Sequence, residues 1–248
     1  MRRVFAMVAT TAFLLSTGCG VKVYEERLNR TLAEMKYRKR LDDKLMPAST
    51  KGKMEQLLIY LRPPKSLQGP GKEFQLTVIE PGKFDVTESY YEPEKQSLHV
   101  LARVKRPKGP DNKKAAANPA ETATRGEFNA DVIAVLNSVY SLDIDLTKAK
   151  EEPKRRNKFK RLAFEVPGKN VEVFLYGSKT SPYEVALVFE YAKTEKAALA
   201  SKIDLALGSF AVGEMARRMF SGALSDEEAS DGGAAAPGGP SPDRKSVV

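Results

Sequence analysis

The chain has 248 residues and a formal net charge of +9, with 42% hydrophobic and 29% charged residues, so it can bury a core and is not disordered throughout. It contains one Cys and one His, which excludes an internal disulfide, a zinc or iron–sulfur site built on several cysteines, and a His-rich metal site. We therefore expect no metal and no cofactor.

The first residues have the three-part layout of an export signal. Arg2 and Arg3 form a basic start, residues 4–15 are apolar and uncharged, and small residues precede Cys19. This apolar run is shorter than the ~20 residues that a membrane-spanning helix requires. The segment LLSTGC, which ends at Cys19, resembles the lipobox of bacterial lipoproteins, although Ser16 stands where Leu is usual. The alternative is an ordinary secretory signal with a coincidental cysteine.

The lipobox resemblance implies a signal peptide over 1–18, cleavage before Cys19 and lipid on its thiol. Two or three acyl chains would hold the protein on a membrane, because one chain alone gives only marginal binding. We expect a location in the cell envelope, facing the periplasm. Gly20 replaces the Asp that is associated with inner-membrane retention, which slightly favours the outer membrane.

The processed chain is basic. Removal of Arg2 and Arg3 lowers the net charge to +7, and the segment 225–248 carries −3, so residues 19–224 carry +10. Nucleic acid is not available to an exported protein, so the expected partners are the membrane through the lipid anchor, an envelope protein or an anionic envelope polymer. The alternative is a basic surface that only keeps the protein soluble.

Residues 21–46 contain no Pro or Gly and predict a helix with two apolar clusters at different angles. Either the helix bends near Lys36, or it contacts different surfaces along its length. In the second case the later half packs on the domain, while the earlier half faces a partner or acts as a stalk. The earlier cluster contains Tyr24, Leu28, Leu32 and Met35, and the later one contains Tyr37, Leu41 and Leu45.

Residues 47–220 are expected to form one domain in which short connections join antiparallel strands. Residues 107–124 lack large apolar side chains and are interpreted as a flexible loop, and 225–248 as a disordered tail. Helices are predicted at 124–142, with a capping box of Thr124 and Glu127, and at 194–213. A continuation of the second helix to Phe220 is left open. Strands are predicted at 56–62, 73–79, 83–91, 97–104, 162–166, 171–176 and 183–191.

These elements predict an α+β fold, in which a mostly antiparallel sheet of six or seven strands is sandwiched with helices. The order of elements, Pro63-Pro64 after the first strand, and the ending EVALVFEYAKTEKAALASKIDLALGSFAVG resemble the PsbP/DcrB-like envelope proteins over roughly 50–213. The resemblance implies a binding or assembly role and carries over no catalytic residue.

Several small motifs are weak candidates for chemistry. His99 has no second His or Cys partner and is interpreted as a surface or edge residue. The pair Asp143 and Asp145 supplies far fewer oxygens than Ca²⁺ requires, so a loop role is favoured. The segment 69–72 lacks the spacing of a phosphate loop and indicates a turn, and Tyr90-Tyr91 is compatible with strand residues or an interface pair.

The basic stretch 148–161 is the best functional candidate, as a contact for an anion or partner, although a solvated loop is the favoured interpretation. We expect a non-enzymatic, lipid-anchored envelope protein that acts by binding or assembly. The alternative is a ligand-binding or hydrolytic periplasmic protein with a pocket between sheet and helices, favoured if a concave site gathers two carboxylates or a Ser with a base. The contact candidates are Lys154, Arg155, Arg156, Lys158, Lys160 and Arg161.

Overall fold

The computed structural model describes residues 18–49, 52–71, 82–105, 126–154, 157–177 and 180–220. Five sequence-based expectations lie outside the described residues: the signal peptide up to residue 17, the strand 73–79, the loop 107–124, the side chains of Arg155 and Arg156, and the tail 225–248.

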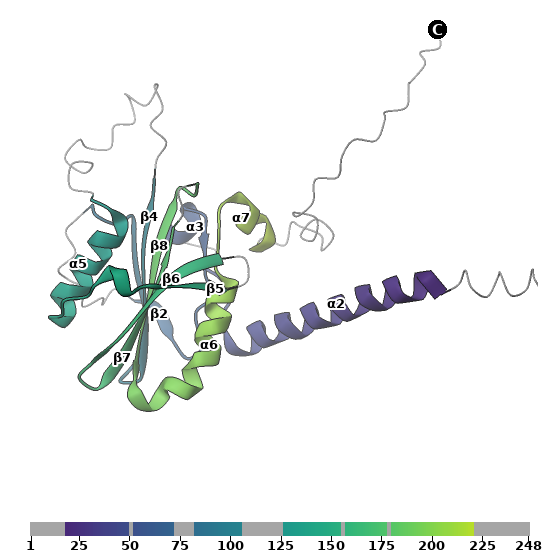
Figure 1. Cartoon of the computed structure of the whole chain (residues 1–248), viewed down its shortest axis with the longest axis horizontal. Coiled ribbons are helices and arrows are strands. Elements are labelled where there is room, and N and C mark those ends of the chain that lie inside the picture. Colours follow the sequence, from purple (N-terminus) through teal and green to yellow (C-terminus); the bar gives the residue numbers. More distant parts are fainter. Residues whose placement is uncertain are drawn as a thin grey trace, which may run out of the picture.

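Among the described residues, the main sheet has seven strands, all antiparallel to their neighbours, in the order β2-β3-β4-β8-β7-β6-β5. Helices lie on both sides of this sheet (Figure 1), which confirms the predicted α+β fold. The strands are β2 (Gln68–Gly71), β3 (Val86–Glu92), β4 (Gln96–Val104), β5 (Lys150–Lys154), β6 (Asn157–Val166), β7 (Lys169–Tyr176) and β8 (Tyr183–Ala192).

Alternating side chains divide the core into two layers, because successive residues of a strand point to opposite faces. One layer joins one face of the sheet to helix α6 (Lys196–Ser209) and to the end of helix α2 (Gly18–Lys44). The other layer joins the opposite face to helix α5 (Phe128–Tyr140). In β8 the alternation is plain: Val185 and Leu187 face α6, whereas Ala186 and Val188 face α5.

The structure differs from the predictions at the boundaries of several elements. The strand expected at 56–62 is shorter than predicted: helix α3 (Lys53–Gln56) and a turn at 57–58 precede it, and only β1 (Ile59–Tyr60) is a strand. The capping box is wrong, because Glu127 itself is the N-cap of α5 and its side chain makes no capping bond. A 3₁₀ turn, Lys193–Glu195, precedes α6, and another, Leu146–Lys148, precedes β5.

The helix expected at 194–213 ends earlier than predicted, at Ser209. Phe210 is extended, and the next two residues form strand β9 (Ala211–Val212), which pairs with β1. Gly213 then adopts a φ of 87°, a left-handed conformation that glycine adopts without strain. Helix α7 (Glu214–Phe220) follows as a separate element.

The basic stretch 148–161 is a β-hairpin made of β5 and β6, not a solvated loop. Phe159 is 1% exposed and packs against Phe174 and Phe210. Its burial holds the hairpin at the edge of the sheet, because an aromatic side chain contributes a large apolar area to the core. The hairpin therefore presents its lysines on two defined faces.

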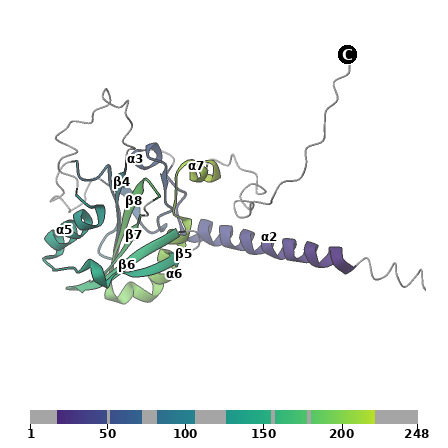
Figure 2. The same cartoon turned by 45° about the horizontal axis from the view of Figure 1, so that its top comes forward.

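Helix α2 projects from the domain as one continuous helix (Figures 1 and 2). Tyr37, Leu41 and Leu45 at its end are buried in the core, whereas the earlier apolar cluster is exposed. The expectation that the helix contacts different surroundings along its length is confirmed. Among the described residues, no helix has both the length and the apolar composition needed to cross a bilayer.

Candidate functional site

The hairpin divides the predicted basic cluster between the two faces of the sheet. Lys154 lies on the α6 face, where its ammonium is 2.8 Å from Asp204 and 3.1 Å from Glu152. The bond to Asp204 is the main reason that the pKa of Lys154 is raised. Arg161 is on the same face and its guanidinium is 3.1 Å from Glu172. These two cations are already paired.

Lys158 and Lys160 lie on the opposite face of β6, the one that faces α5. Both side chains are exposed, and neither forms an ion pair with another described residue. They alternate with buried Phe159, so the pleat of the strand points both in one direction. Of the predicted contact residues that the structure describes, these two remain available to a partner.

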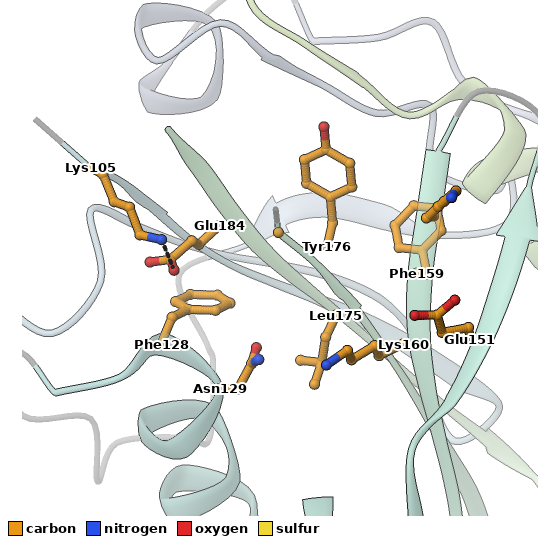
Figure 3. Close-up of a pocket in the computed structure, with 11 residues that line it drawn as sticks. Lys105, Phe128, Asn129, Glu151, Phe159, Lys160, Leu175, Tyr176 and Glu184 are labelled. Carbon is orange, nitrogen blue, oxygen red and sulfur yellow. Dashed lines mark ion pairs between the residues drawn. The ribbon is translucent and has the colours of Figure 1, made fainter. Parts of the chain in front are cut away.

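A cleft of about 490 Å³ lies under these lysines, between the start of α5 and the hairpin. Figure 3 shows Phe128 and Asn129 of α5 on one side and Lys160 with Glu151 on the other. Leu175 and Tyr176 of β7 lie between them. The lining residues are Lys105, Phe128, Asn129, Glu151, Lys158, Phe159, Lys160, Leu175, Tyr176, Gly177 and Glu184.

A partly buried network of charges adjoins the cleft, and two of its members, Lys105 and Glu184, line it. Arg103 is buried, and its guanidinium is 3.1 Å from Glu184 and 3.2 Å from Asp131. Lys105 binds the other oxygen of Glu184 at 2.7 Å, and Lys83 is 3.7 Å from Asp131. Three cations therefore share two carboxylates. Buried charges require such pairing because transfer of an unpaired ion out of water is very costly.

The Arg103 guanidinium also lies 5.3 Å from the centre of the Phe128 ring, within the range of a cation–π contact. This contact fixes the first turn of α5 over the charged network. It places Phe128 as a rigid wall of the cleft, with Asn129 beside it. No local sequence pattern predicts this network, because its members lie far apart in the chain.

The cleft combines an excess of positive charge with apolar walls. Three cations (Lys105, Lys158 and Lys160) and two carboxylates (Glu151 and Glu184) line it. Phe128, Leu175 and Tyr176 supply apolar surface. A pocket with apolar walls and a few placed polar groups is the usual form of a small-ligand site. This one suits an anion with an apolar body.

The cleft contains two carboxylates, the feature that would favour hydrolysis. Glu184, however, is held by Arg103 and Lys105, while Glu151 is exposed on edge strand β5 and lies opposite Lys160 in the strand register.

A second polar cluster lies on the same face of the sheet, at the other end of α5. His99 Nε2 is 3.0 Å from Glu190 Oε1, and His99 Nδ1 is 3.0 Å from Ser89 Oγ. The Tyr140 hydroxyl donates to Glu190 Oε1 at 2.5 Å, and Lys169 donates to Oε2 at 3.3 Å. His99 is therefore a part-buried residue of a central strand, and its interpretation as a surface or edge residue is wrong.

These contacts lower the pKa of Glu190 to about 2. Burial alone raises it, but the hydrogen bonds from His99 and Tyr140, together with the charge of Lys169, outweigh that effect. Burial and the neighbouring Glu190 carboxylate raise the pKa of Tyr140. Glu190 thus remains ionised and fully bonded at neutral pH.

The line Ser89–His99–Glu190 has the residue types of a hydrolytic triad, but Ser89 is 1% exposed and does not line the cleft. The register explains why these residues meet: Ser89 lies directly opposite His99 on β3 and β4, and Glu190 pairs with Ser97, two positions away. The cluster of Ser89, His99 and Glu190 could have been predicted only from the pairing of β3, β4 and β8.

The remaining motif candidates have structural roles. Asp145 accepts hydrogen bonds from the Thr147 amide and hydroxyl, which caps the 3₁₀ turn and lowers the pKa of Asp145. Gly69 to Gly71 lie in strand β2 instead of an isolated turn. Tyr90 is buried and Tyr91 is exposed. The described residues contain no group of His, Cys, Asp and Glu that could hold a metal ion.

No family model matches the sequence, and no curated protein is similar to it. Among solved structures, the chain is similar to the PsbP protein CyanoP of the cyanobacterium Synechocystis sp. PCC 6803, with a TM-score of 0.41 and 13% identity, covering 68% of this chain and 93% of that one. It is also similar to a Bacteroides thetaiotaomicron protein, with a TM-score of 0.37 and 8% identity over 68% of this chain and 49% of that one.

A third similar structure is the Ran-binding protein Mog1p of Saccharomyces cerevisiae, with a TM-score of 0.33 and 10% identity over 71% of this chain and 90% of that one. The sequence resembles PsbP proteins, and the structure is also similar to a PsbP protein, at low sequence identity. At these TM-scores the similarity carries no argument about function.

Proposed function

We propose that this protein is a non-enzymatic, lipid-anchored protein of the bacterial cell envelope that binds an anionic ligand with an apolar body in the cleft beneath Lys158 and Lys160. The observation that carries the proposal is the division of the basic hairpin. Lys154 and Arg161 are neutralised by neighbouring carboxylates, whereas Lys158 and Lys160 are exposed over a concave, partly apolar site.

The lipid anchor rests on the signal layout and on the lone Cys19. Cys19 lies in the first turn of α2, and residues 22–36 of α2 are exposed before Tyr37 reaches the core. A lipid on Cys19 would therefore be separated from the domain by about five turns of helix. This spacing supports a domain held beside a membrane with its cleft open to the periplasm.

The binding proposal is tested with anilinonaphthalene sulfonate, a fluorescent anion with an apolar body, on the chain that begins at residue 19 and carries Cys19→Ser. The double variant Lys158→Gln/Lys160→Gln should bind about tenfold more weakly, because a hydrogen bond to a charged group contributes about 1.5–3 kcal/mol. The matched control Lys154→Gln/Arg161→Gln removes two cations from the same hairpin on the other face. It should bind the probe as well as the unmodified chain.

Equal affinity of both double variants for the probe would contradict the cleft as the binding site.

The anchor is tested separately in cells. Cys19→Ser in the full chain should give a soluble or unprocessed protein, and a processed variant that still fractionates with membranes would overturn the lipid anchor. A pull-down from solubilised envelopes, with Lys158→Gln/Lys160→Gln as the comparison, would then show which envelope component depends on the cleft.

A further inference from the structure

The part of α2 that projects from the domain carries an exposed apolar stripe. Tyr24, Leu28, Leu32 and Met35 are each at least 43% exposed. At about 100° per residue they fall within about 80° of one another around the helix axis. The stripe is about 16 Å long, at 1.5 Å per residue.

The stripe faces away from the domain. Its centre lies about 140° around the helix from the direction of Tyr37, Leu41 and Leu45, the residues by which α2 packs on the core. Figures 1 and 2 both show this part of α2 extending clear of the sheet and of helices α5 and α6. A flat surface can therefore reach the stripe without meeting the domain.

Cations border the stripe on both sides. Arg27 lies beyond Tyr24 on one edge, Lys36 lies beyond Leu32 on the other, and Lys39 continues the same face toward the domain. All three side chains are exposed, and none forms an ion pair with another described residue. Between Tyr24 and Lys39, Glu25 is the one acidic residue that the same angles place on this side of the helix. Nearer the domain, Asp43 and Asp42 lie on this side as well, and Asp42 is paired with Arg62 at 2.8 Å.

We infer that this stripe, bounded by Arg27, Lys36 and Lys39, is a docking surface for an anionic lipid bilayer. An amphipathic helix with apolar residues on one face and cations beside them lies in the interface of a membrane, and its affinity is the sum of apolar burial and attraction to anionic lipids. Long basic side chains keep their charge at the headgroups while their stems cover apolar surface. Tyr24 suits the interface because its ring is apolar and its hydroxyl is polar.

The same charges argue against a second copy of the chain as the occupant. Two parallel copies joined along their stripes would bring Lys39 of one helix against Lys39 of the other. The stripe also spans fewer heptads than the three or four that a sustained coiled coil requires. Anionic headgroups, in contrast, would neutralise the cations on both edges at once.

This docking surface goes beyond the cleft and the lipid anchor, and its test is independent of both. The chain that begins at residue 19 with Cys19→Ser, which keeps the described helix from Cys19 onward and the domain, is sedimented with vesicles that contain phosphatidylglycerol and with vesicles of phosphatidylcholine alone. We expect binding to the anionic vesicles that weakens as salt is raised, because salt screens the attraction.

Two variants separate the contributions. Leu28→Asp/Leu32→Asp should weaken vesicle binding at least about tenfold, because it removes apolar burial and adds repulsive charge. Lys36→Gln/Lys39→Gln should weaken binding to the anionic vesicles by about fivefold per cation and leave the weak binding to neutral vesicles unchanged. The control is Met215→Asp/Met219→Asp, an exposed apolar pair on α7, which should bind like the unmodified chain.

The inference is overturned if the unmodified chain binds neither kind of vesicle at low salt, or if the control loses as much binding as Leu28→Asp/Leu32→Asp. It is also overturned if sedimentation velocity shows a dimer that the same double variant converts to a monomer, since the stripe would then be a contact between copies. Circular dichroism of each variant checks that the domain is folded. Loss of the anchor in cells or of probe binding in the cleft leaves the vesicle result unaffected.

Discussion

Tyr140, the last residue of α5, donates its hydroxyl hydrogen to Glu190 on the central strand β8 at 2.5 Å. At the other end of the same helix, Phe128 lies over Arg103 of β4. Helix α5 is thus held on the sheet by polar contacts at both ends and by an apolar layer between them. Because Phe128 lines the cleft, rigidity at this end keeps one wall of the site in place.

The network around Glu190 predicts acid sensitivity. A carboxyl whose pKa falls from the usual 4.5 to about 2 in the folded protein stabilises the fold fully above pH 4.5 and loses this contribution as the pH falls toward 2. The contribution is about 3 kcal/mol at neutral pH, at 1.36 kcal/mol per pKa unit. The groups that face Glu190 are His99 on β4, Tyr140 on α5 and Lys169 on β7.

Urea unfolding at a series of pH values checks this prediction. Glu190→Gln should be less stable than the unmodified chain at pH 6, and the difference should shrink as the pH is lowered from 4.5 to 2. A difference that stays constant over this range would contradict the role of Glu190.

Arg103→Met should lower the free energy of unfolding by about 3 kcal/mol. Removal of one partner from a buried ion pair leaves the other charge without compensation, and here both Glu184 and Asp131 lose their buried partner. The loss is at the lower end of the usual range because Lys105 and Lys83 remain. The control Arg217→Met, at an exposed ion pair with Glu214, should change stability by less than about 0.5 kcal/mol. Thermal and urea unfolding measure both.

Gly168, in the turn between β6 and β7, has a φ of 80° and open space where a Cβ would stand. Gly168→Ala should therefore destabilise the fold by about 1 kcal/mol through backbone strain alone. Gly177 has no positive φ, and its added Cβ would be 3.8 Å from the nearest heavy atom, so Gly177→Ala should be neutral or slightly stabilising. Equal effects of the two substitutions in urea unfolding would contradict this explanation.

Ser89 should not react with a fluorophosphonate, although it lies beside His99. Its hydroxyl is buried on β3, and both ring nitrogens of His99 are close to fixed partners. A nucleophile needs space for the reacting carbonyl within about 3–3.5 Å. Labelling of the folded chain, detected by mass spectrometry and lost in Ser89→Ala, would favour the hydrolytic alternative.

Periodicity predicted the fold class and most of the elements correctly, because alternating and helical patterns record which side chains are buried. The strands around Leu98 and Val185 and the helix around Val132 follow from these patterns. The predicted helix at 194–213 was too long because its apolar spacing continues past Ser209. The pairing of Ala211 and Val212 with β1 is a long-range contact that no local pattern contains.

The candidate site could be predicted only in part. The concentration of positive charge at 148–161 is visible in the sequence, but its division into paired and available cations depends on which residues of β6 share a face. Lys160 and Arg161 are adjacent in β6 and therefore point to opposite faces of the sheet: Lys160 lines the cleft, whereas Arg161 is paired with Glu172. The cluster at His99 was missed because it depends on the register of three strands, two of which are far apart in the chain.

The small sheet of β1 and β9 joins the two ends of the domain. Ile59 and Val212 are paired although 153 positions separate them in the chain, and Phe220 stacks on Tyr60 with ring centres 5.1 Å apart. Contacts between such distant residues form late in folding, because the entropy of a long loop opposes them. The small sheet can therefore form only after nearly all of the domain's chain is present, so a chain still emerging from the ribosome would remain incompletely folded.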